Sequence, residues 1–240
     1  MTTNPIIVAL DFEDAQQART LVSRLGPAVD FYKVGMELYA AAGMPFVREL
    51  IGEGKQVFLD LKLYDIGETV KRTVAQVART EVRFLTIHAI NPVMRAAREG
   101  RGEASLKLMA VTVLTSFDQQ DVTDMGYPFS LSELVALRVR NAMEIGMDGI
   151  ICSPLDVAAV RKITGPAAIV ATPGVRSHTA NRGDQKRVAT PAEALTAGAN
   201  YIVMGREVTR ANDPADQIAR VIDQIKAGDT KPSLTCPVPG

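Results

Sequence analysis

The sequence predicts one α/β domain in which eight parallel strands alternate with helices and close into a (β/α)8 TIM barrel. Short apolar runs alternate with amphipathic stretches along the whole chain, as in the repeated strand–helix units of a parallel sheet. The chain has 240 residues, close to the roughly 250 that such a barrel uses. The first strand–helix turn, LDFEDA, lacks the G-x-G-x-x-G motif of an open dinucleotide-binding sheet.

Eight short apolar runs, most of them rich in β-branched residues, are the predicted strands. Their apolar residues are consecutive rather than alternating, which is typical of parallel strands that are covered on both faces. In chain order the runs occupy residues 6–10, 30–34, 56–60, 84–88, 106–114, 149–153, 168–172 and 201–205.

The stretches between the runs carry apolar residues at the spacing of amphipathic helices. No linker interrupts the alternation, so we expect one catalytic domain over residues 1–228. The tail at 229–240 contains three prolines and is expected to be a flexible end. The clearest helical stretches are 14–25, 45–54, 69–80, 131–146 and 214–228.

Composition excludes several classes of protein. Hydrophobic residues make up 47 % of the chain, too many for a disordered protein. Lys plus Arg and Asp plus Glu both number 27, so no net charge attracts nucleic acid or an anionic membrane. Two cysteines exclude a disulfide framework. The N-terminus lacks the basic region of a signal peptide, and no apolar stretch reaches the roughly 20 residues of a membrane span. We therefore expect a cytoplasmic protein without a nucleic-acid or membrane partner.

Polar residues follow every predicted strand, and barrels of this kind carry out chemistry at the carboxyl ends of their strands. At any single position, a polar residue that simply ends the strand is a sufficient explanation. It is insufficient for Lys33 within FYKVG, because burying a lysine without a partner costs free energy. The strand-end residues are Asp11, Lys33, Asp60 with Lys62, His88, Thr115 with Ser116, Ser153, Thr172 with Pro173, and Gly205 with Arg206.

The densest group of charges lies in FLDLKLYDIGET, residues 58–69. It is either a solvated loop or a site, since burying charge is costly unless the partners are well arranged. Asp60 and Lys62 are two residues apart and should point to one face of the strand, where Lys33 of the neighbouring strand could join them. Asp65 follows on the loop or in the first helical turn. A lysine held beside carboxylates stays protonated and can donate a proton, so the pattern favours an acid–base array.

The last two predicted strands are followed by glycine and arginine, in TPGVR (172–176) and MGREV (204–208). Loops at these positions of a barrel commonly bind phosphate. Glycine lets backbone N–H groups approach an oxyanion, and the guanidinium groups of Arg176 and Arg206 match phosphate geometry. The irregular segment 173–190 is long enough that we expect it to be functional or disordered.

The remaining reactive residues give weaker signals. His88 and His178 lack the spacing of metal ligands, and His88 has the position of a packing or hydrogen-bonding residue at a strand end. Cys152 lies in an apolar run, which is typical of an unreactive buried thiol. Neither a G-x-S-x-G motif nor a P-loop is present.

These segments resemble the bacterial type of orotidine 5′-phosphate decarboxylase. The resemblance runs from residue 6 to about 225, and D-x-K-x-x-D-I is the most specific motif of that family. It implies a (β/α)8 barrel, a homodimer, and conversion of orotidine 5′-monophosphate to UMP and carbon dioxide in de novo pyrimidine biosynthesis, without a metal or cofactor. The segments that carry it are VALDF, FYKVG, FLDLKLYDI, TVLTS, TPGVR and VMGR.

The resemblance also implies roles for individual residues. Lys62 donates the proton to C6 of the pyrimidine, and Asp60 faces the departing carboxylate. Lys33 and Asp65 complete the charged array, with Asp65 and Thr69 reaching the site from the other subunit.

Further residues are implied to bind the substrate. Asp11 and Lys33 contact the ribose, Ser116 contacts the base, and the segment 173–190 is the lid. The other implied substrate-binding residues are Thr115 and Pro173 and, for the phosphate, Arg176, Gln185, Gly205 and Arg206.

Two alternatives share parts of this pattern. Sugar-phosphate decarboxylases, aldolases and epimerases of related barrels have the D-x-K-x-x-D stretch, but their metal-dependent members need an acidic ligand where this chain has Lys33. A non-catalytic barrel that binds a nucleotide would retain the phosphate loops and could lose the array, whereas all four charges are present here. Both observations favour the decarboxylase.

Overall fold

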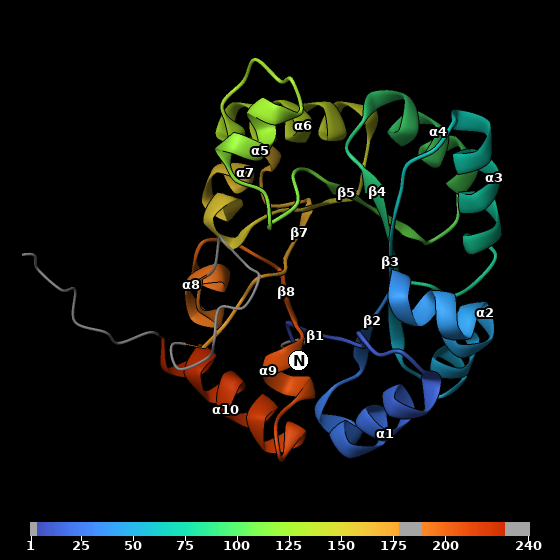
Figure 1. The fold of residues 1–240 in the computed structure, drawn as a ribbon, viewed down its shortest axis with the longest axis vertical. Coiled ribbons are helices and arrows are strands. Elements are labelled where there is room, and N and C mark those ends of the chain that lie inside the picture. Colours follow the sequence, from blue (N-terminus) through green and yellow to red (C-terminus); the bar gives the residue numbers. More distant parts are fainter. Residues whose placement is uncertain (1–3, 178–188, 229–240) are drawn as a thin grey trace, which may run out of the picture.

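Eight parallel strands pair in chain order, and β8 pairs with β1 to close the barrel, which confirms the predicted fold. The computed structural model describes residues 4–177 and 189–228. Figure 1 shows the strands surrounded by a ring of helices. The strands are β1 (Ile6–Ala9), β2 (Phe31–Gly35), β3 (Gln56–Leu63), β4 (Phe84–His88), β5 (Lys107–Val111), β6 (Gly149–Ile151), β7 (Ile169–Thr172) and β8 (Tyr201–Met204).

Two strands differ clearly from their predicted bounds. β3 continues past residue 60 to Leu63, because it carries a bulge that lengthens it. β5 ends at Val111, although the apolar run extends to residue 114. Val113 is buried in the loop that follows, so the apolar run there reflects burial and not strand pairing.

Helices cover the outside of the barrel; the predicted stretches 14–25, 131–146 and 214–228 each contain one, and the stretch 69–80 overlaps α3, which begins at Gly67 and ends at Val77. The predicted stretch 45–54 corresponds to the second part of α2, because the helical backbone is interrupted at Gly43 (φ 60°), before Pro45; the first part, which begins at Met36, was not predicted. In the described residues the helices are α1 (Ala15–Leu25), α2 (Met36–Gly52), α3 (Gly67–Val77), α4 (Asn91–Arg101), α5 (Gln119–Asp124), α6 (Leu131–Ile145), α7 (Val157–Thr164), α8 (Pro191–Thr196), α9 (Arg206–Thr209) and α10 (Pro214–Ala227).

Successive residues of each strand face opposite sides of the sheet, and this produces two apolar layers. The larger layer packs between the strands and the helices. The smaller one fills the barrel and consists of Ile7, Ala9, Phe31, Phe58, Phe84, Met109, Val111, Ile151, Ala171 and Val203. Two residues beyond the phenylalanines of β2, β3 and β4 stand Lys33, Asp60 and Thr86. The interior therefore changes from apolar to polar toward the carboxyl ends of these strands.

The amino end of the barrel is closed by an arginine stacked on aromatic rings. The Arg83 guanidinium lies 5.3 Å from the ring centre of Phe31, 5.5 Å from that of Phe84 and 5.7 Å from that of Tyr201. Arg83 Nη2 also donates a hydrogen bond of 2.9 Å to the Tyr201 hydroxyl. This packing leaves the opposite end of the barrel as the place for a site.

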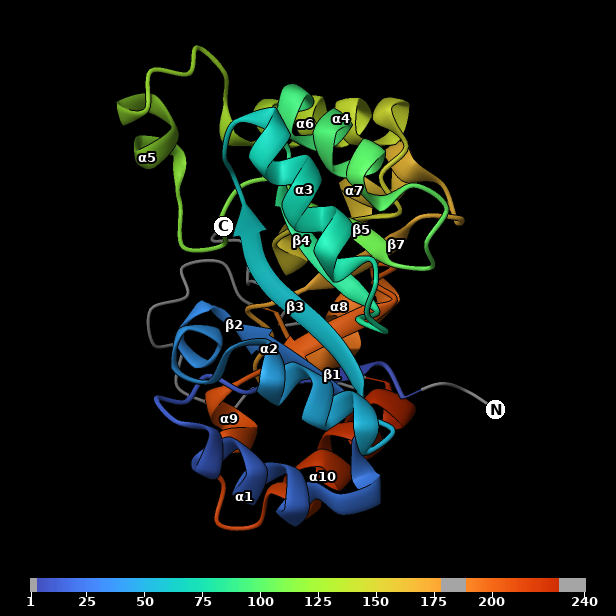
Figure 2. The ribbon, with the colours of Figure 1, turned by 90° about the vertical axis from the view of Figure 1, so that its right-hand side faces the viewer.

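At that opposite end, a connection over residues 112–118 joins β5 to α5. Figure 2 shows that α5 stands out from the ring of helices on the side toward which β3 points. Within the described ranges, no helix is both long and apolar enough to cross a membrane. The predicted tail at 229–240 and most of the predicted lid, residues 178–188, lie outside the described residues.

Candidate active site at the carboxyl ends of the strands

The pairing of β3 with β4 is irregular at the charged residues. Leu59 pairs with Leu85 and Leu63 pairs with Ile87, so β3 advances four residues while β4 advances two. A bulge of this kind re-aims side chains and is common beside active sites. Lys62 within it has a φ of 47°, the one positive φ outside glycine in the described chain. Regular alternation therefore does not continue through Lys62, although its side chain still meets Asp60.

Three charged side chains from two strands meet at this bulge. Lys62 Nζ donates a hydrogen bond of 2.9 Å to Asp60 Oδ2, and Lys33 Nζ lies 3.6 Å from the same oxygen. Lys33 also donates to Asp11 Oδ1 over 2.8 Å. The side chains of Lys33 and Asp60 are 12 % exposed, and that of Asp11 is 55 % exposed. The result is a row of alternating charges that runs from the mouth of the barrel into its interior.

The Asp60 carboxylate remains ionised in this setting. Its burial by itself raises the pKa of Asp60, but the charges of Lys33 and Lys62 lower it, as do hydrogen bonds from Lys62 and Thr86. The net direction is downward, because the opposite charges outweigh the loss of solvation. Asp60 therefore keeps a negative charge between the two lysines at neutral pH.

Gly35 makes room for the ion pair between Lys33 and Asp11. A Cβ atom at Gly35 would lie 2.9 Å from Lys33 Nζ and 3.2 Å from Asp11 Oδ1. Any larger side chain at this position would displace one of the two charged groups. The glycine at the end of FYKVG thus serves the geometry of the array as well as the turn into α2.

A cleft of about 560 Å³ opens beside Lys33 and Asp11, between the end of β1 and the loops after β7 and β8. Three arginines line it: Arg176 in the loop after β7, and Arg206 and Arg210 at the start of α9 and just past its end. A cleft with this lining suits an anionic group next to a polar ring. Three of the four residues predicted to bind the phosphate line it, Arg176, Gly205 and Arg206, and so does Pro173, which was predicted to bind the substrate.

Asp65 and Thr69, which were predicted to act from another subunit, do not join the array of their own chain. Both are exposed, Asp65 in the loop after β3 and Thr69 in the first turn of α3. Asp65 Oδ1 accepts a hydrogen bond from the Ile66 N–H, and in the described residues it forms no ion pair with Lys33 or Lys62. Tyr64 and Ile66 on either side are 68 % and 73 % exposed. This loop therefore presents apolar surface around a carboxylate.

The other predicted substrate-binding residues do not line the described part of this cleft. Thr115 and Ser116 are half-buried in the turn between β5 and α5, and neither lines the cleft beside Lys33. Gln185 lies outside the described residues. The structure thus groups Arg176, Gly205 and Arg206 with Lys33 and leaves Thr115 and Ser116 on a separate loop.

Sequence reasoning missed Thr86. It is fully buried, and its hydroxyl donates to Asp60 Oδ1 over 2.9 Å and accepts from the Lys62 N–H over 2.8 Å. Alternation along FLTIH could have indicated it, because residues two apart share a face and Phe84 faces the barrel interior. His88 lies two residues beyond Thr86, at the end of β4. Burial lowers the pKa of His88, and the charges of Arg138 and Lys62 lower it further, so its imidazole is neutral at neutral pH.

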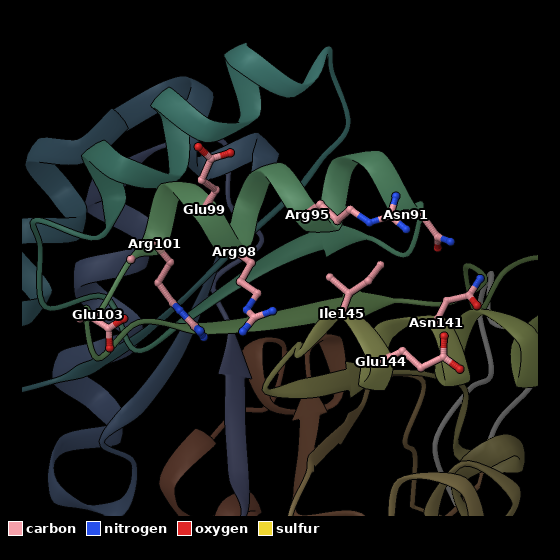
Figure 3. A pocket seen from close by; sticks show the side chains of 10 residues that line it. Asn91, Arg95, Arg98, Glu99, Arg101, Glu103, Asn141, Glu144 and Ile145 are labelled. Carbon is pink, nitrogen blue, oxygen red and sulfur yellow. The ribbon is translucent and has the colours of Figure 1, made fainter.

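A larger hollow, of about 810 Å³, lies between α4 and α6 on the outside of the barrel (Figure 3). Arg95, Arg98 and Arg101 line it from α4, together with the acidic residues Glu99 and Glu144. None of its ten lining residues, all in the described chain, is hydrogen-bonded to the array of Lys33, Asp60 and Lys62. We assign it no part in the candidate site.

Comparisons with known proteins identify the family of the chain. A family model described as "Orotidine 5′-phosphate decarboxylase / HUMPS family" matches residues 4–221. The chain is 48 % identical over 222 residues to an orotidine 5′-phosphate decarboxylase of Rhodopseudomonas palustris, covering 92 % of this chain and 94 % of the relative. It is 47 % identical over 226 residues to one from a Caulobacter species, covering 94 % and 99 %. The crystal structure of orotidine 5′-phosphate decarboxylase from Lactobacillus acidophilus superposes with a TM-score of 0.81 at 34 % identity, over 92 % of this chain and 99 % of that chain.

Proposed function

The chain belongs to the orotidine 5′-phosphate decarboxylase / HUMPS family, and on that premise we propose that it converts orotidine 5′-monophosphate to UMP and carbon dioxide in pyrimidine biosynthesis. One observation carries this proposal beyond the family. Lys33, Asp60 and Lys62 form a partly buried row of alternating charges next to a cleft that three arginines line, Arg176, Arg206 and Arg210. A nucleotide with a charged ring substituent and a phosphate offers the complementary groups.

We further propose that Lys62 is the proton donor. Breaking the bond between C6 and the carboxylate releases carbon dioxide and leaves the bonding electron pair on C6. The Lys62 ammonium stabilises that negative charge and then transfers a proton from Nζ to C6. Lysine regains its proton from water after UMP leaves. The hydrogen bond of 2.9 Å to Asp60 supports this role, since it holds Nζ in place at the strand end.

Asp60 and Lys33 have supporting roles in this scheme. The lowered pKa of Asp60 keeps its carboxylate charged, and this charge attracts and orients the ammonium groups of both lysines. Lys33 lies between Asp11 and Asp60, so it can both balance these acids and donate to a ribose hydroxyl. The carboxylate of the substrate would enter next to Asp60 and would leave as uncharged carbon dioxide.

The phosphate of the substrate is proposed to lie in the cleft beside Arg176 and Arg206. Charge-assisted hydrogen bonds from guanidinium groups are stronger than neutral ones. Binding energy from this remote group can be used to order loops around the reacting ring. Ser116, in the connection between β5 and α5, is proposed to contact the base, and Thr115 beside it is proposed to bind the substrate.

We also propose that the active unit is a homodimer in which Asp65 and Thr69 reach the site of the partner. Support comes from the exposed loop after β3, where Tyr64 and Ile66 surround Asp65 with apolar surface. Asp65 makes no ion pair with the lysines of its own chain in the part that the structure describes. A second copy seated on this loop would bury the apolar side chains and give Asp65 its partners.

The metal-dependent alternative has less support. Lys33 Nζ is 2.8 Å from Asp11 and 3.6 Å from Asp60, so a divalent ion placed between these two acids would meet a fixed positive charge. The non-catalytic alternative is disfavoured because Lys33, Asp60 and Lys62 are held together beside the phosphate-side cleft, an arrangement of charges that binding a nucleotide alone does not require.

The test is an assay of the purified protein with orotidine 5′-monophosphate in excess chelator, following the loss of pyrimidine absorbance. We expect turnover at the same rate with and without chelator. Activity that disappears in chelator and returns with a divalent ion would support the metal-dependent alternative. Tight binding of UMP without turnover would support the non-catalytic barrel.

A further inference from the structure

Thr86 occupies the interior of the barrel opposite the bulge of β3. It is 0 % exposed and lies on β4, two residues beyond Phe84 of the inner apolar layer. Its hydroxyl donates a hydrogen bond of 2.9 Å to Asp60 Oδ1 and accepts one of 2.8 Å from the Lys62 N–H. One buried side chain thus contacts both the carboxylate and the backbone of the residues that form the array.

The bond to the Lys62 N–H replaces a missing backbone partner. β3 and β4 lose their regular register between Leu59 and Leu63, and a bulge of this type leaves backbone groups without a ladder partner. Buried N–H groups need an acceptor, and the Thr86 hydroxyl supplies it. Residues other than glycine rarely adopt a positive φ. Lys62 does so here, and the hydrogen bond from its N–H to Thr86 stabilises that conformation.

The two oxygens of the Asp60 carboxylate have different partners. Oδ1 accepts from Thr86, while Oδ2 accepts from Lys62 and lies 3.6 Å from Lys33. The carboxylate plane is therefore set by a neutral group on one side and by the two lysines on the other. A valine at position 86 would fill the same space and provide neither bond.

We propose that Thr86 is a positioning residue for the decarboxylation, which holds Lys62 through its backbone and orients Asp60 through one carboxylate oxygen. The inference rests on the proposed function, because it assigns Lys62 and Asp60 their roles in that reaction. Thr86 does not line the cleft of the proposed phosphate site. Its loss should therefore affect the reacting end of the substrate and not the phosphate end.

The first experiment compares Thr86→Val and Thr86→Ser with the parent protein in the decarboxylation assay. For Thr86→Val we expect kcat to fall roughly 10- to 100-fold with KM nearly unchanged, since small misplacements of a catalytic group cost about this much. Thr86→Ser keeps the hydroxyl and should recover most of kcat. Thr112→Val is the matched control, because Thr112 is equally buried and its hydroxyl donates only to the Ile151 carbonyl.

The outcomes of this assay separate the alternatives. Parent-like kcat in a folded Thr86→Val, or losses in Thr86→Ser as large as in Thr86→Val, would overturn the inference. Equal losses in Thr112→Val would mean that any buried hydroxyl matters, which also overturns it. A parent protein that binds the nucleotide but never turns it over would instead refute the proposed function.

The second experiment requires no turnover. Amide hydrogen exchange at Lys62, followed by NMR, should be slow in the parent and in Thr86→Ser and at least tenfold faster in Thr86→Val. Unchanged protection in Thr86→Val would show that another group holds the Lys62 N–H, and the inference would fail even if the enzyme is a decarboxylase.

Discussion

The Lys33 ammonium lies 3.6 Å from the Asp60 carboxylate across the pair of strands β2 and β3, and both side chains are 12 % exposed. This relationship stabilises a charge that burial alone would disfavour. The pKa of Asp60 should therefore change when Lys33 is replaced.

Replacing Lys33 by methionine should raise the pKa of Asp60. Lys33 is the charge that lowers this pKa most, so without it the effect of burial, which raises the pKa, carries more weight. In the parent, the stability that Asp60 contributes is complete above the usual carboxyl pKa and is lost as pH falls through its lower folded pKa. In Lys33→Met the contribution of Asp60 to the free energy of unfolding should begin to fall at a higher pH. Each unit by which the folded-state pKa rises removes about 1.4 kcal/mol of that contribution.

Carbon-13 NMR titration of the aspartates and urea unfolding between about pH 3 and pH 7 measure the two effects. Lys107→Met is the control, because Lys107 pairs with Asp148 at an exposed position on β5. An Asp60 carboxyl that titrates at the same pH in parent and Lys33→Met would contradict the electrostatic account.

Lys62→Ala should retain the fold and lose turnover by at least roughly 100-fold, the lower range for a general acid. The reason is that Lys62 is the proposed donor of the proton to C6 of the pyrimidine. Circular dichroism checks the fold and the absorbance assay checks turnover. Lys226→Ala, on the exposed face of α10, should behave like the parent. Turnover close to normal in Lys62→Ala would remove Lys62 from the proposed role.

Mixing inactive Asp65→Ala with inactive Lys62→Ala subunits should restore activity. If each site takes Asp65 from the partner, a hybrid dimer has one site with both defects and one site with neither. Recovered activity should approach about a quarter of the parent value at random exchange, since half the dimers are hybrids with one intact site. Native mass spectrometry of differently labelled subunits checks exchange. Demonstrated exchange without recovery would show that the sites are not shared.

Arg206→Ala should slow the phosphorylated substrate roughly 10- to 100-fold in kcat/KM, the equivalent of a charge-assisted hydrogen bond of about 1.5–3 kcal/mol. Orotidine without the phosphate never makes this contact and should lose almost nothing. Added phosphite should stimulate the reaction of orotidine in the parent and only weakly in Arg206→Ala. Arg220→Ala, an exposed arginine of α10, is the control. Equal losses with both substrates would mean that Arg206 supports the fold.

Arg83→Met should destabilise the protein by about 2 kcal/mol or more, because stacking on several aromatic rings and a hydrogen bond to Tyr201 are lost together. The turnover of the folded fraction should not change, since Arg83 is at the closed end of the barrel. Urea unfolding gives the stability. Arg72→Met breaks only an exposed pair with Glu68 and should cost about 0.5 kcal/mol or less. Similar costs for both variants would contradict this account of the closed end.

The sequence determined the alternation of strands and helices, because continuous apolar runs and helical spacing are local properties of the chain. It also located the charged residues at the strand ends, since polar groups stop a buried strand wherever they occur. Lys33 was recognisable for the same reason, as a lysine inside an apolar run requires a buried partner.

Only the tertiary structure decided how these residues meet. The bulge that turns Lys62 to a positive φ and the role of Thr86 depend on the register between β3 and β4. Register follows from the packing of distant segments around a closed barrel, and no local pattern in FLTIH specifies which residue of β3 stands opposite it. The charged residues of the site could be identified from the sequence. The distances between them follow from the closure of the barrel, which brings β2, β3 and β4 together.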